Sequence, residues 1–224
     1  MQNTTVSDIV MEAVDFEDNL SLTNLQMLPE LLESIVQKKV LSLKYKKGFS
    51  DPGYYTISPY FLRQYNQRWY LFAHNNTSRS IQSFSVDRIL RINPDDTEKY
   101  KIISLAKLRR FKADYFGRIV GVTNREEDPV IDLQLSFRKD TEDKEWDGVV
   151  SRFYNLLESN PFLERFVFSS NEREDMATVK GIKMNRELEN KLIVYAHTAR
   201  ISDDALRKVI VKRAKRILST QEDK

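Results

Sequence analysis

The sequence contains no cysteine and only two histidines, His74 and His197, among its 224 residues. Without thiols the chain can form no disulfide, no thiolate nucleophile and no cysteine-based zinc or iron site. With only two imidazoles a histidine-based metal site is not expected either, so we predict no metal and no cofactor. The absence of cysteine also fits a protein of a reducing compartment.

Long hydrophobic runs are missing as well. Charged residues make up 31% of the chain, and they interrupt every apolar stretch before the roughly 20 residues that a membrane-spanning helix needs. The N-terminus lacks the basic and then apolar pattern of a signal peptide. We therefore expect a cytoplasmic protein that does not enter a membrane. The 41% hydrophobic content is enough for one large domain or two small ones to bury a core.

The motifs of common enzyme classes are also absent. The six glycines are scattered, and the chain has no glycine-rich phosphate loop, no HExxH motif and no nucleophile elbow. The adjacent carboxylates of Asp203 and Asp204 precede a predicted helix, where capping accounts for them. We predict that the protein is not an enzyme and has no catalytic residue.

What the sequence does have is a strong segregation of charge. Residues 1–37 carry seven acidic side chains and no Lys or Arg, whereas residues 38–92 carry ten basic side chains and two acidic ones. Residues 205–218 add six basic side chains and no acidic one. Basic patches on a chain whose net charge is only +3 indicate an anionic partner, such as phosphate or nucleic acid. The alternative is an ordinary solvated surface whose cations pair with the chain's own acids.

Short strands follow one another between residues 40 and 92. A helix that begins at Pro29 is predicted to precede them. Its apolar residues are spaced to share one face and are Leu31, Leu32, Ile35 and Val36. The strands are predicted, from alternation and from aromatic and β-branched content, at residues 40–47, 54–62, 68–74, 80–86 and 88–92. Five short strands with tight connections and no helix between them favour a small antiparallel barrel.

The second half of the chain predicts a different α+β arrangement. Residues 105–121 form a basic, helical connector. The elements that follow are a strand at 130–137, a helix at 145–161, strands at 164–170 and 178–184, a helix at 185–196, a strand at 199–202 and a last helix at 203–218. In this last helix, Asp203 is the expected N-cap. The order βαββαβ is that of a ferredoxin-like domain, here with an extra C-terminal helix.

The segment RWYLFAH, residues 68–74, is the most suggestive of the predicted strands. Its two-residue period puts Trp69, Leu71 and Ala73 on one face, which we assign to the core. The opposite face carries a cation, a phenol, a phenyl ring and an imidazole, from Arg68, Tyr70, Phe72 and His74. Such a row suits the stacking of a base and the pairing of a phosphate. The alternative is that Tyr70 and Phe72 simply pack beneath a loop, that Arg88 pairs with Asp87 or another acidic neighbour, and that His74 is an ordinary surface histidine.

These residues carry a family resemblance. The stretch ISPYFLRQYNQRWYLFAHN, followed by IQSFSVDRI, resembles the signature of the WYL domain, named for the triplet seen here as Trp69, Tyr70 and Leu71. The resemblance covers residues 30–92, and residues 115–218 more weakly resemble the C-terminal extension of such regulators. Residues 1–20 resemble the linker that follows an N-terminal helix-turn-helix domain, which is absent here.

The resemblance implies an Sm-like barrel that senses an anionic effector, a nucleotide or single-stranded nucleic acid, and passes the signal to transcription. The positions that match the family's motifs are Pro59, Tyr60, Arg68, Tyr70, Asp87 and Arg88. Three positions depart from the family: Ser58 stands where histidine is common, and Gln82 and Ser85 stand where many members have arginine. Fewer arginines weaken phosphate affinity, so the ligand is less charged or the pocket is degenerate.

Together these observations predict four segments: an N-terminal tether at 1–28, the WYL Sm-like barrel at 29–95, a connector at 96–124 and a ferredoxin-like extension at 125–220. The predicted ligand-binding residues are Tyr60, Arg63, Arg68, Tyr70, His74, Arg79, Ser83 and Arg88. In this hypothesis Arg68 and Arg88 pair phosphates, and Tyr60, Tyr70 or Phe84 stacks on a base. The cations expected to steer the anion are Arg63, Arg79, Lys44, Lys46 and Lys47.

The function predicted from the sequence is a ligand-sensing regulatory module without catalysis. It is expected to form a homodimer and to reach DNA through a partner or through a missing N-terminal domain. The rival hypothesis is a non-catalytic protein-interaction or oligomerisation module with no ligand of its own, in which the basic surface is incidental.

Overall fold

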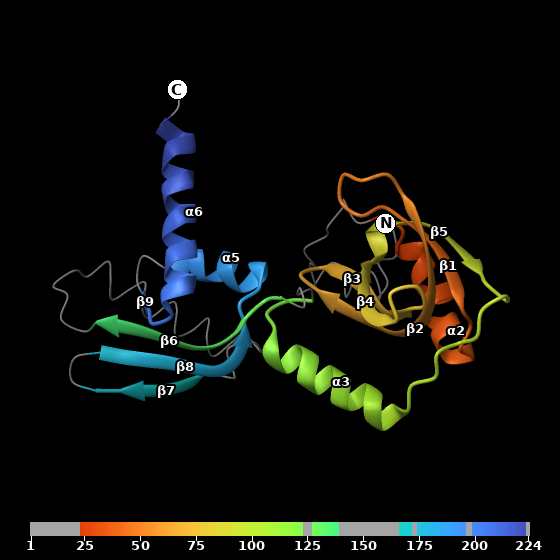
Figure 1. Cartoon of the computed structure of the whole chain (residues 1–224), viewed down its shortest axis with the longest axis horizontal. Coiled ribbons are helices and arrows are strands. Elements are labelled where there is room, and N and C mark those ends of the chain that lie inside the picture. Colours follow the sequence, from red (N-terminus) through yellow and green to blue (C-terminus); the bar gives the residue numbers. More distant parts are fainter. Residues whose placement is uncertain (1–22, 123–126, 139–165, 172–173, 196–198, 223–224) are drawn as a thin grey trace, which may run out of the picture. The chain divides into compact units, whose positions relative to one another are not determined.

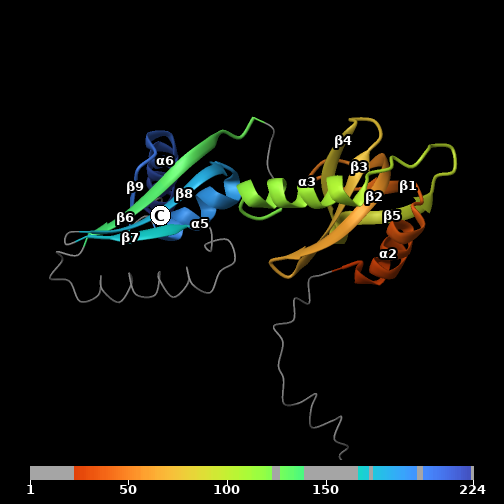
Figure 2. The same ribbon diagram turned by 90° about the horizontal axis from the view of Figure 1, so that it is seen from below.

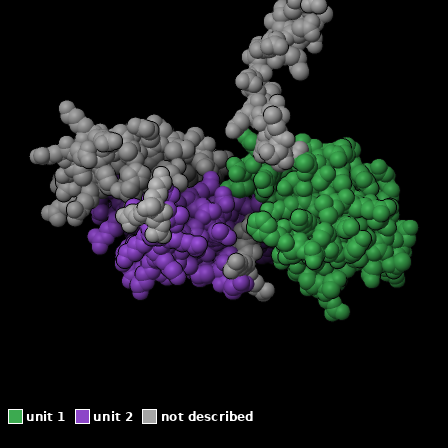
Figure 3. Space-filling model, turned by 90° about the horizontal axis from the view of Figure 1, so that it is seen from above, with its two compact units in different colours: residues 1–102 green, residues 103–224 purple. Residues whose placement is uncertain are grey.

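The computed structural model describes residues 23–122, 127–138, 166–171, 174–195 and 199–222. The chain divides into two compact units, Met1–Ile102 and Ile103–Lys224, which Figure 3 colours separately. Each unit contains one antiparallel sheet, so the protein is of the α+β class, as predicted. Among the described residues, no helix is both long and apolar enough to cross a membrane. The domain boundaries inferred from the sequence stay predictions.

The first unit is a five-stranded antiparallel sheet (Figure 1). Its strands are β1 (Leu41–Tyr45), β2 (Gly53–Tyr65), β3 (Arg68–Asn75), β4 (Ser80–Ser85) and β5 (Ile89–Pro94). The strand order is β4-β3-β2-β1-β5. The long β2 serves both halves, because its first part pairs with β1 and its second part with β3. A two-residue turn of Asn66 and Gln67 at positive φ, 48° and 59°, joins β2 to β3 in the geometry that matches the twist of a hairpin.

The sheet curves strongly, as Figures 1 and 2 show. Its edge strands β4 and β5 do not pair with each other in the part of the chain that the structure describes. The predicted strands are therefore all present as one antiparallel sheet, but they do not close into a hydrogen-bonded barrel. The side of this sheet that carries the buried core is named the inner face, and the other side is named the outer face.

Alternation builds the core of the first unit on the inner face. The buried residues of this core are Leu31, Leu41, Leu43, Tyr45, Ile57, Leu71, Ala73, Phe84, Val86 and Ile89. The predicted alternation of Leu41, Leu43 and Tyr45 is confirmed, because each of them is buried. Leu71 is fully buried and Trp69 packs against the same cluster, so both belong to the core, as predicted.

The predicted lead-in helix is α2 (Leu28–Gln37), which follows the short helix η1 (Leu25–Met27) and contacts β2. Its buried face differs from the prediction. Leu31 is fully buried and Ile35 packs against the core, but Leu32 and Val36 are 55% and 72% exposed. A helix turns about 100° per residue, so the stripe centred on Leu31, Ser34 and Ile35 leaves its two flanking apolar residues in water.

The second unit contains a four-stranded antiparallel sheet and three described helices. Its elements are α3 (Leu105–Arg118), β6 (Val130–Arg138), β7 (Val167–Ser170), β8 (Glu174–Lys183), α5 (Arg186–Tyr195), β9 (Arg200–Ile201) and α6 (Asp204–Glu222). The strand order is β7-β8-β6-β9. In Figure 1, α5 and α6 lie on the same side of this sheet. The helix predicted at 145–161 lies outside the described residues.

Side-chain caps fix where these helices begin. Asp203 is the predicted N-cap of α6, and its Oδ1 accepts a hydrogen bond from the backbone N–H of Leu206 at 2.7 Å. Asn185 caps α5 in the same way, through Leu188 N–H at 2.9 Å, and its amide also donates to the Val120 carbonyl. The hydrophobic residues behind these caps, such as Leu188 and Leu206, are fully buried in the unit's core.

Candidate functional site

The cross-strand register brings five of the predicted site residues onto one surface. On β3, Arg68, Tyr70 and His74 alternate with the buried inner residues and so point to the outer face. Directly opposite Tyr70 stand Arg63 on β2 and Ser85 on β4, and opposite Phe72 stand Phe61 and Ser83. We name this surface the candidate face; it consists of Phe61, Arg63, Tyr65, Arg68, Tyr70, Phe72, His74, Ile81, Ser83 and Ser85.

The centre of the candidate face is filled by stacked rings. Phe61 and Phe72 lie parallel, with centroids 4.6 Å apart and planes 5° apart, and Phe72 is only 1% exposed. Phe72 is therefore not available to stack on a base: its ring is packed, and its partner is Phe61 of β2 rather than a loop. Phe84, another candidate for stacking, lies in the inner core and makes edge contacts with Tyr45 and Tyr55. Of the rings proposed to stack on a base, Tyr70 is the one that is only partly buried.

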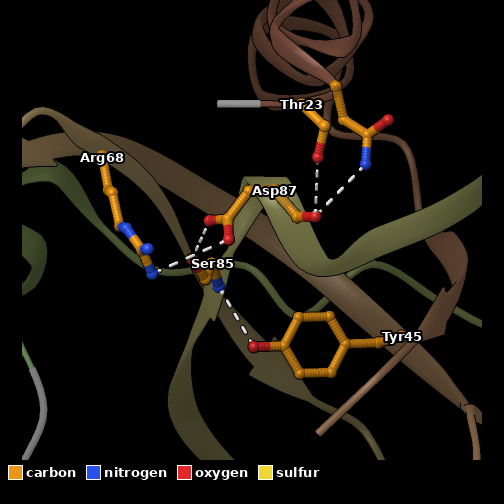
Figure 4. A network of polar contacts seen from close by, with 6 residues as sticks. Thr23, Tyr45, Arg68, Ser85 and Asp87 are labelled. Carbon is orange, nitrogen blue, oxygen red and sulfur yellow. Dashed lines mark hydrogen bonds and ion pairs between the residues drawn. The ribbon is translucent and has the colours of Figure 1, made fainter. Parts of the chain in front are cut away.

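A polar network lies at the end of the candidate face nearest the β2–β3 turn (Figure 4). The Arg68 guanidinium approaches the Asp87 carboxylate, with 3.8 Å between Nη1 and Oδ2. The Ser85 hydroxyl donates a short hydrogen bond to Asp87 Oδ1, and the Ser85 backbone N–H donates to the Tyr45 hydroxyl at 3.3 Å. Asp87 therefore holds Arg68 at the rim of the face.

The same network is tied to the N-terminal part of the described chain. Asp87 belongs to a short helix, η2 (Val86–Arg88), and its carbonyl accepts hydrogen bonds from Thr23 Oγ1 at 3.2 Å and from Asn24 Nδ2 at 3.3 Å. The Asn24 amide also donates to the Ile89 carbonyl at 2.9 Å. These contacts fix the backbone of η2 and thus the position of the Asp87 carboxylate.

Arg88 does not form the ion pair with Asp87 that the sequence offered as its alternative role. Its side chain is exposed, and it makes no ion pair with the residues that the structure describes. Its charge acts on Tyr45: burial raises the pKa of the Tyr45 hydroxyl, and the hydrogen bond from Ser85 and the positive charge of Arg88 oppose that rise. Arg88 is thus a solvent-exposed cation at the same end of the sheet as Arg68.

Three hydrogen bonds join β2 to the last residues of the first unit. Tyr60, Pro59 and Ser58 of β2 contact residues 100 and 101, which follow β5. The Tyr60 hydroxyl donates to the Lys101 carbonyl at 2.8 Å, and the Tyr100 hydroxyl donates to the Pro59 carbonyl at 2.5 Å. The Lys101 N–H donates to Ser58 Oγ at 2.9 Å. We call these five residues the latch, and they fasten the last residues of the first unit onto β2.

The latch places its phenols in a low-polarity environment. Burial raises the pKa of Tyr60. Burial and, to a lesser degree, the neighbouring Tyr60 raise the pKa of Tyr100 to about 12. Tyr60 is only 6% exposed and its ring contacts the ring of Tyr100, so it does not present a free face to a ligand. Sequence reasoning selected Tyr60 but missed Tyr100; the signal was a single aromatic residue within the charged segment DDTEKYK, residues 95–101.

Two cationic residues of the candidate face are shifted towards their neutral forms. Burial lowers the pKa of Arg63, although an arginine remains charged at neutral pH. Burial and then the charge of Lys101 lower the pKa of His74. The lowered pKa of His74 favours the neutral imidazole, which offers one donor and one acceptor rather than a charge.

The remaining predicted residues mark the two ends of the face. Arg79 is exposed in the β3–β4 turn, with φ 55°, beyond the His74 end. Arg88 lies beyond the Arg68 end, and Arg68 and His74 are six residues apart on β3, about 20 Å along the strand. No mononucleotide bridges that length. The structure thus brings Arg63, Arg68 and Tyr70 together, with Ser83 near them, and leaves Arg79 too far away to share a small ligand with Arg68.

Comparison with known proteins finds one family match, which lies within the first unit. Residues 26–94 match the family model of the WYL domain, which covers all five strands of the first sheet and every predicted site residue. No curated protein matches the chain. Similar solved structures include proteasome accessory factor B/C (PafBC) of Arthrobacter aurescens, with 17% identity, a TM-score of 0.32, and coverage of 83% of this chain and 25% of that chain. Another is a CRISPR Cas-related protein, with 11% identity, a TM-score of 0.46, and coverage of 87% and 52%. The chain therefore spans about a quarter of the length of the first and about half of the second.

Proposed function

Since residues 26–94 form a WYL domain, we propose that the chain is the ligand-sensing regulatory module of a WYL-type transcriptional regulator. Its effector is anionic, a nucleotide or a short single-stranded nucleic acid, and binds the candidate face. The module performs no catalysis and needs no cofactor. A cytoplasmic location and a homodimeric state belong to the same proposal.

The observation that carries this proposal is the register of β2, β3 and β4. It sets Arg63 and Tyr70 directly opposite each other, with Arg68 and Ser83 on the same face. Cations beside a phenol and hydroxyl groups supply the contacts that phosphate and a base need: charge-assisted hydrogen bonds and a stacking surface. The segment 38–92 has ten basic and two acidic residues, so its field attracts anions.

The finer fold assignments belong to the proposal as well. A curved five-stranded sheet with tight turns supports an Sm-like barrel for the first unit. For the second unit, β8 lies between β6 and β7, and β6 lies between β8 and β9. β6 and β7, which follow each other in the described chain, are thus separated by β8, and β8 and β9, which α5 connects, are separated by β6; this is the split arrangement expected of a ferredoxin-like domain.

The latch is the route by which we propose that occupancy is passed on. It joins β2, whose next residues, Phe61 and Arg63, belong to the candidate face, to residues 100 and 101 at the end of the first unit. A ligand that shifts this part of β2 strains three hydrogen bonds. Differential binding to the latched and unlatched states would then bias the downstream chain.

Titration with short labelled ligands tests the proposed function. A labelled nucleoside triphosphate and a labelled trinucleotide are too short to bind several surfaces at once. We expect both to bind more weakly as salt is raised. Arg68→Ala is expected to weaken binding by about 1.5–3 kcal/mol, because it removes a charge-assisted contact. The matched control is Arg110→Ala, an exposed arginine on α3 whose side chain is 86% exposed, which should leave binding unchanged.

The same titration decides the rival hypothesis. Absent binding, or an affinity that is flat between low and moderate salt, favours a protein-interaction or oligomerisation module instead. Equal losses in Arg68→Ala and Arg110→Ala would mean that the charge of the whole chain, and not the candidate face, attracts the ligand.

A further inference from the structure

The second unit contains a cavity of about 600 Å³ that opens to solvent. It lies between the last two turns of α3 and the neighbouring parts of β6 and β8, and α3 contacts β8 within this unit. Its volume falls in the range of small-molecule sites, roughly 300–1,000 Å³. We name it the α3 cavity. The charged residues and glycines of its lining are Asp114, Gly117, Arg118, Asp132, Lys180 and Gly181.

A bulge in β8 forms one wall of the α3 cavity. The register between β6 and β8 shifts between Ile131 and Leu133. At this point Asp132 alone stands opposite Lys180 and Gly181 of β8. Gly181 has φ 66°, the left-handed conformation that glycine adopts in such bulges, and its N–H donates to Asp132 Oδ1 at 2.9 Å. The bulge thus brings a carboxylate and a lysine to one wall, and bulges are frequent beside functional sites.

Two cations line the α3 cavity from two different walls. Arg118 belongs to the last turn of α3, and Lys180 belongs to the bulge of β8. Both side chains are exposed, and neither forms an ion pair with a residue that the structure describes. Two cations that face one cavity in this state can make charge-assisted hydrogen bonds to a carboxylate or a phosphate.

Two carboxylates share the lining with these cations. Asp114 lies one turn before Arg118 and pairs with Arg110 on α3, with 4.0 Å between Oδ2 and Nε. Asp132 accepts the hydrogen bond of the bulge at Oδ1, and its Oδ2 accepts none from the described residues. The four charged side chains of the lining therefore sum to zero. A ligand that carries one charge of each sign complements such a lining better than a simple anion or a simple cation.

Gly117 keeps the helical wall of the α3 cavity free of a side chain. It lies in the last turn of α3, and its φ is not in the left-handed region that would require a glycine. A Cβ at this position would meet no atom within 4 Å, so packing does not require a glycine either. A glycine in a helix is destabilising relative to alanine. Its presence here agrees with a cavity whose space is used by a ligand.

We propose that the α3 cavity binds a small zwitterion of the class of free amino acids and short peptides. Arg118 and Lys180 hold the carboxylate of the ligand. The open Oδ2 of Asp132 accepts from its ammonium group, and Asp114 adds negative charge beside it. The effector of the proposed function binds residues of the first unit, whereas this site lies in the second. Failure of the zwitterion site therefore leaves the nucleotide titration of the candidate face unaffected.

Ligand screening of the full chain tests this site. A melting-temperature screen against the standard amino acids and dialanine finds the tightest binder, because a ligand of the folded state stabilises it. Isothermal titration calorimetry then compares this binder with acetate and with ethylammonium, which carry one charge each. We expect the zwitterion to bind at least about tenfold more tightly than either control. Equal affinity for acetate, or no zwitterion that binds more tightly than about 10 mM, would overturn the proposal.

Charge substitutions locate the bound zwitterion. Arg118→Gln and Lys180→Gln are each expected to weaken its binding about 10- to 100-fold, because each removes a charge-assisted contact. Asp132→Asn keeps an oxygen for the N–H of Gly181 but removes the negative charge, and should weaken binding about tenfold. The matched control is Lys208→Gln, an exposed lysine of α6 outside the cavity, which should bind like the parent. Unchanged affinity in Arg118→Gln and Lys180→Gln, or an equal loss in the control, would overturn the site.

Gly117→Leu separates binding from folding. Leucine favours a helix more than glycine does, so the melting temperature of the free variant should be unchanged or higher. Its side chain enters the α3 cavity, so the affinity for the zwitterion should fall at least about tenfold. A variant that is as stable as the parent and binds the zwitterion equally well would show that the ligand lies elsewhere, and would overturn the proposal.

Discussion

Two parts of the outer face of the first unit use the same residue types in opposite ways. One is the candidate face, and the other is the row of Tyr54, Lys44 and Arg91 across β2, β1 and β5. On the candidate face the rings of Phe61 and Phe72 are stacked and buried, and Arg68 is held by Asp87. In the second row the ring of Tyr54 is exposed, and Lys44 stands opposite another cation, Arg91. Cations and aromatic residues in a sequence therefore do not by themselves identify a ligand surface; burial and pairing decide what each of them does.

This difference has a physical origin in β2. A bulge at residues 59–61 shifts the register, so that Pro59 opposes Ala73 but Phe61 opposes Phe72. Without the bulge, Phe61 would oppose Leu71 on the inner face. The extra residue thus moves a phenyl ring to the outer side of the sheet, where it covers Phe72. No such shift occurs where β2 pairs with β1, and Tyr54 stays uncovered.

The largest contrast between the two surfaces is expected in stability. Phe72→Ala should lower the free energy of unfolding by about 3–5 kcal/mol, because it empties a buried, stacked position. Tyr54→Ala should change it by no more than about 0.5 kcal/mol, because an exposed ring contributes little. Urea unfolding monitored by circular dichroism measures both. Similar losses of stability for the two variants would contradict the statement that Phe72 is packed and Tyr54 is not.

A smaller effect is expected in the pH dependence of stability, because the candidate side of β2 carries buried phenols and Tyr54 is exposed. The unfolded chain releases the Tyr100 proton near the ordinary pKa of 10.0, whereas burial raises the pKa of the folded state to about 12. Tyr100 in the folded state therefore keeps its proton to a higher pH than in the unfolded chain. The resulting stabilisation of the folded state is complete below pH 10 and is lost as the pH rises towards 12. Tyr60, with a pKa raised in the same direction, contributes to the same decline.

Tyr100→Phe sharpens that measurement. The variant loses the hydrogen bond to Pro59, at a cost of about 1 kcal/mol near neutral pH. Its stability should then fall less steeply than that of the parent between pH 10 and 12. Denaturant midpoints measured across this range provide the test. Parallel curves for parent and variant would show that the Tyr100 phenol is not held neutral by the latch.

The smallest difference in stability is expected between substitutions of two cations, Arg68 and Lys44. Arg68→Gln should lower the free energy of unfolding by about 0.2–1 kcal/mol, because it breaks a partly exposed ion pair with Asp87. Lys44→Gln should leave stability unchanged or raise it slightly, because it relieves the repulsion with Arg91. Thermal unfolding of both variants at low salt measures the difference. A loss in Lys44→Gln that equals the loss in Arg68→Gln would show that Lys44 and Arg91 do not repel each other.

Local pattern was enough to predict the elements of the first unit. The two-residue period identified Leu71 and Ala73 as inner residues, because a half-buried strand must alternate. The resemblance to the WYL domain, carried by residues 30–92, is confirmed by the family match at 26–94. The weaker resemblance of residues 115–218 to a C-terminal extension stays a prediction.

The parts of the site that could not be predicted from the sequence depend on long-range contacts. Tyr60 meets Lys101, and Tyr100 meets Pro59, each across 41 positions of the chain. No periodicity of the sequence indicates a contact between residues so far apart in the chain. The partner of Asp87 is Arg68 and not its neighbour Arg88, because the turn of η2 leaves Arg88 in solvent. Likewise, Lys44 was expected only to steer an anion, since its position opposite Arg91 is visible only in the register.

The central claim is that the candidate face holds an anionic effector. Native mass spectrometry of the full chain, purified gently from the organism that encodes it, tests this claim most directly. We predict a retained mass equal to that of a nucleotide or a short oligonucleotide, which is lost when Arg68→Ala protein is prepared in the same way. A parent protein that carries no added mass, or an added mass that persists unchanged in Arg68→Ala, would contradict it.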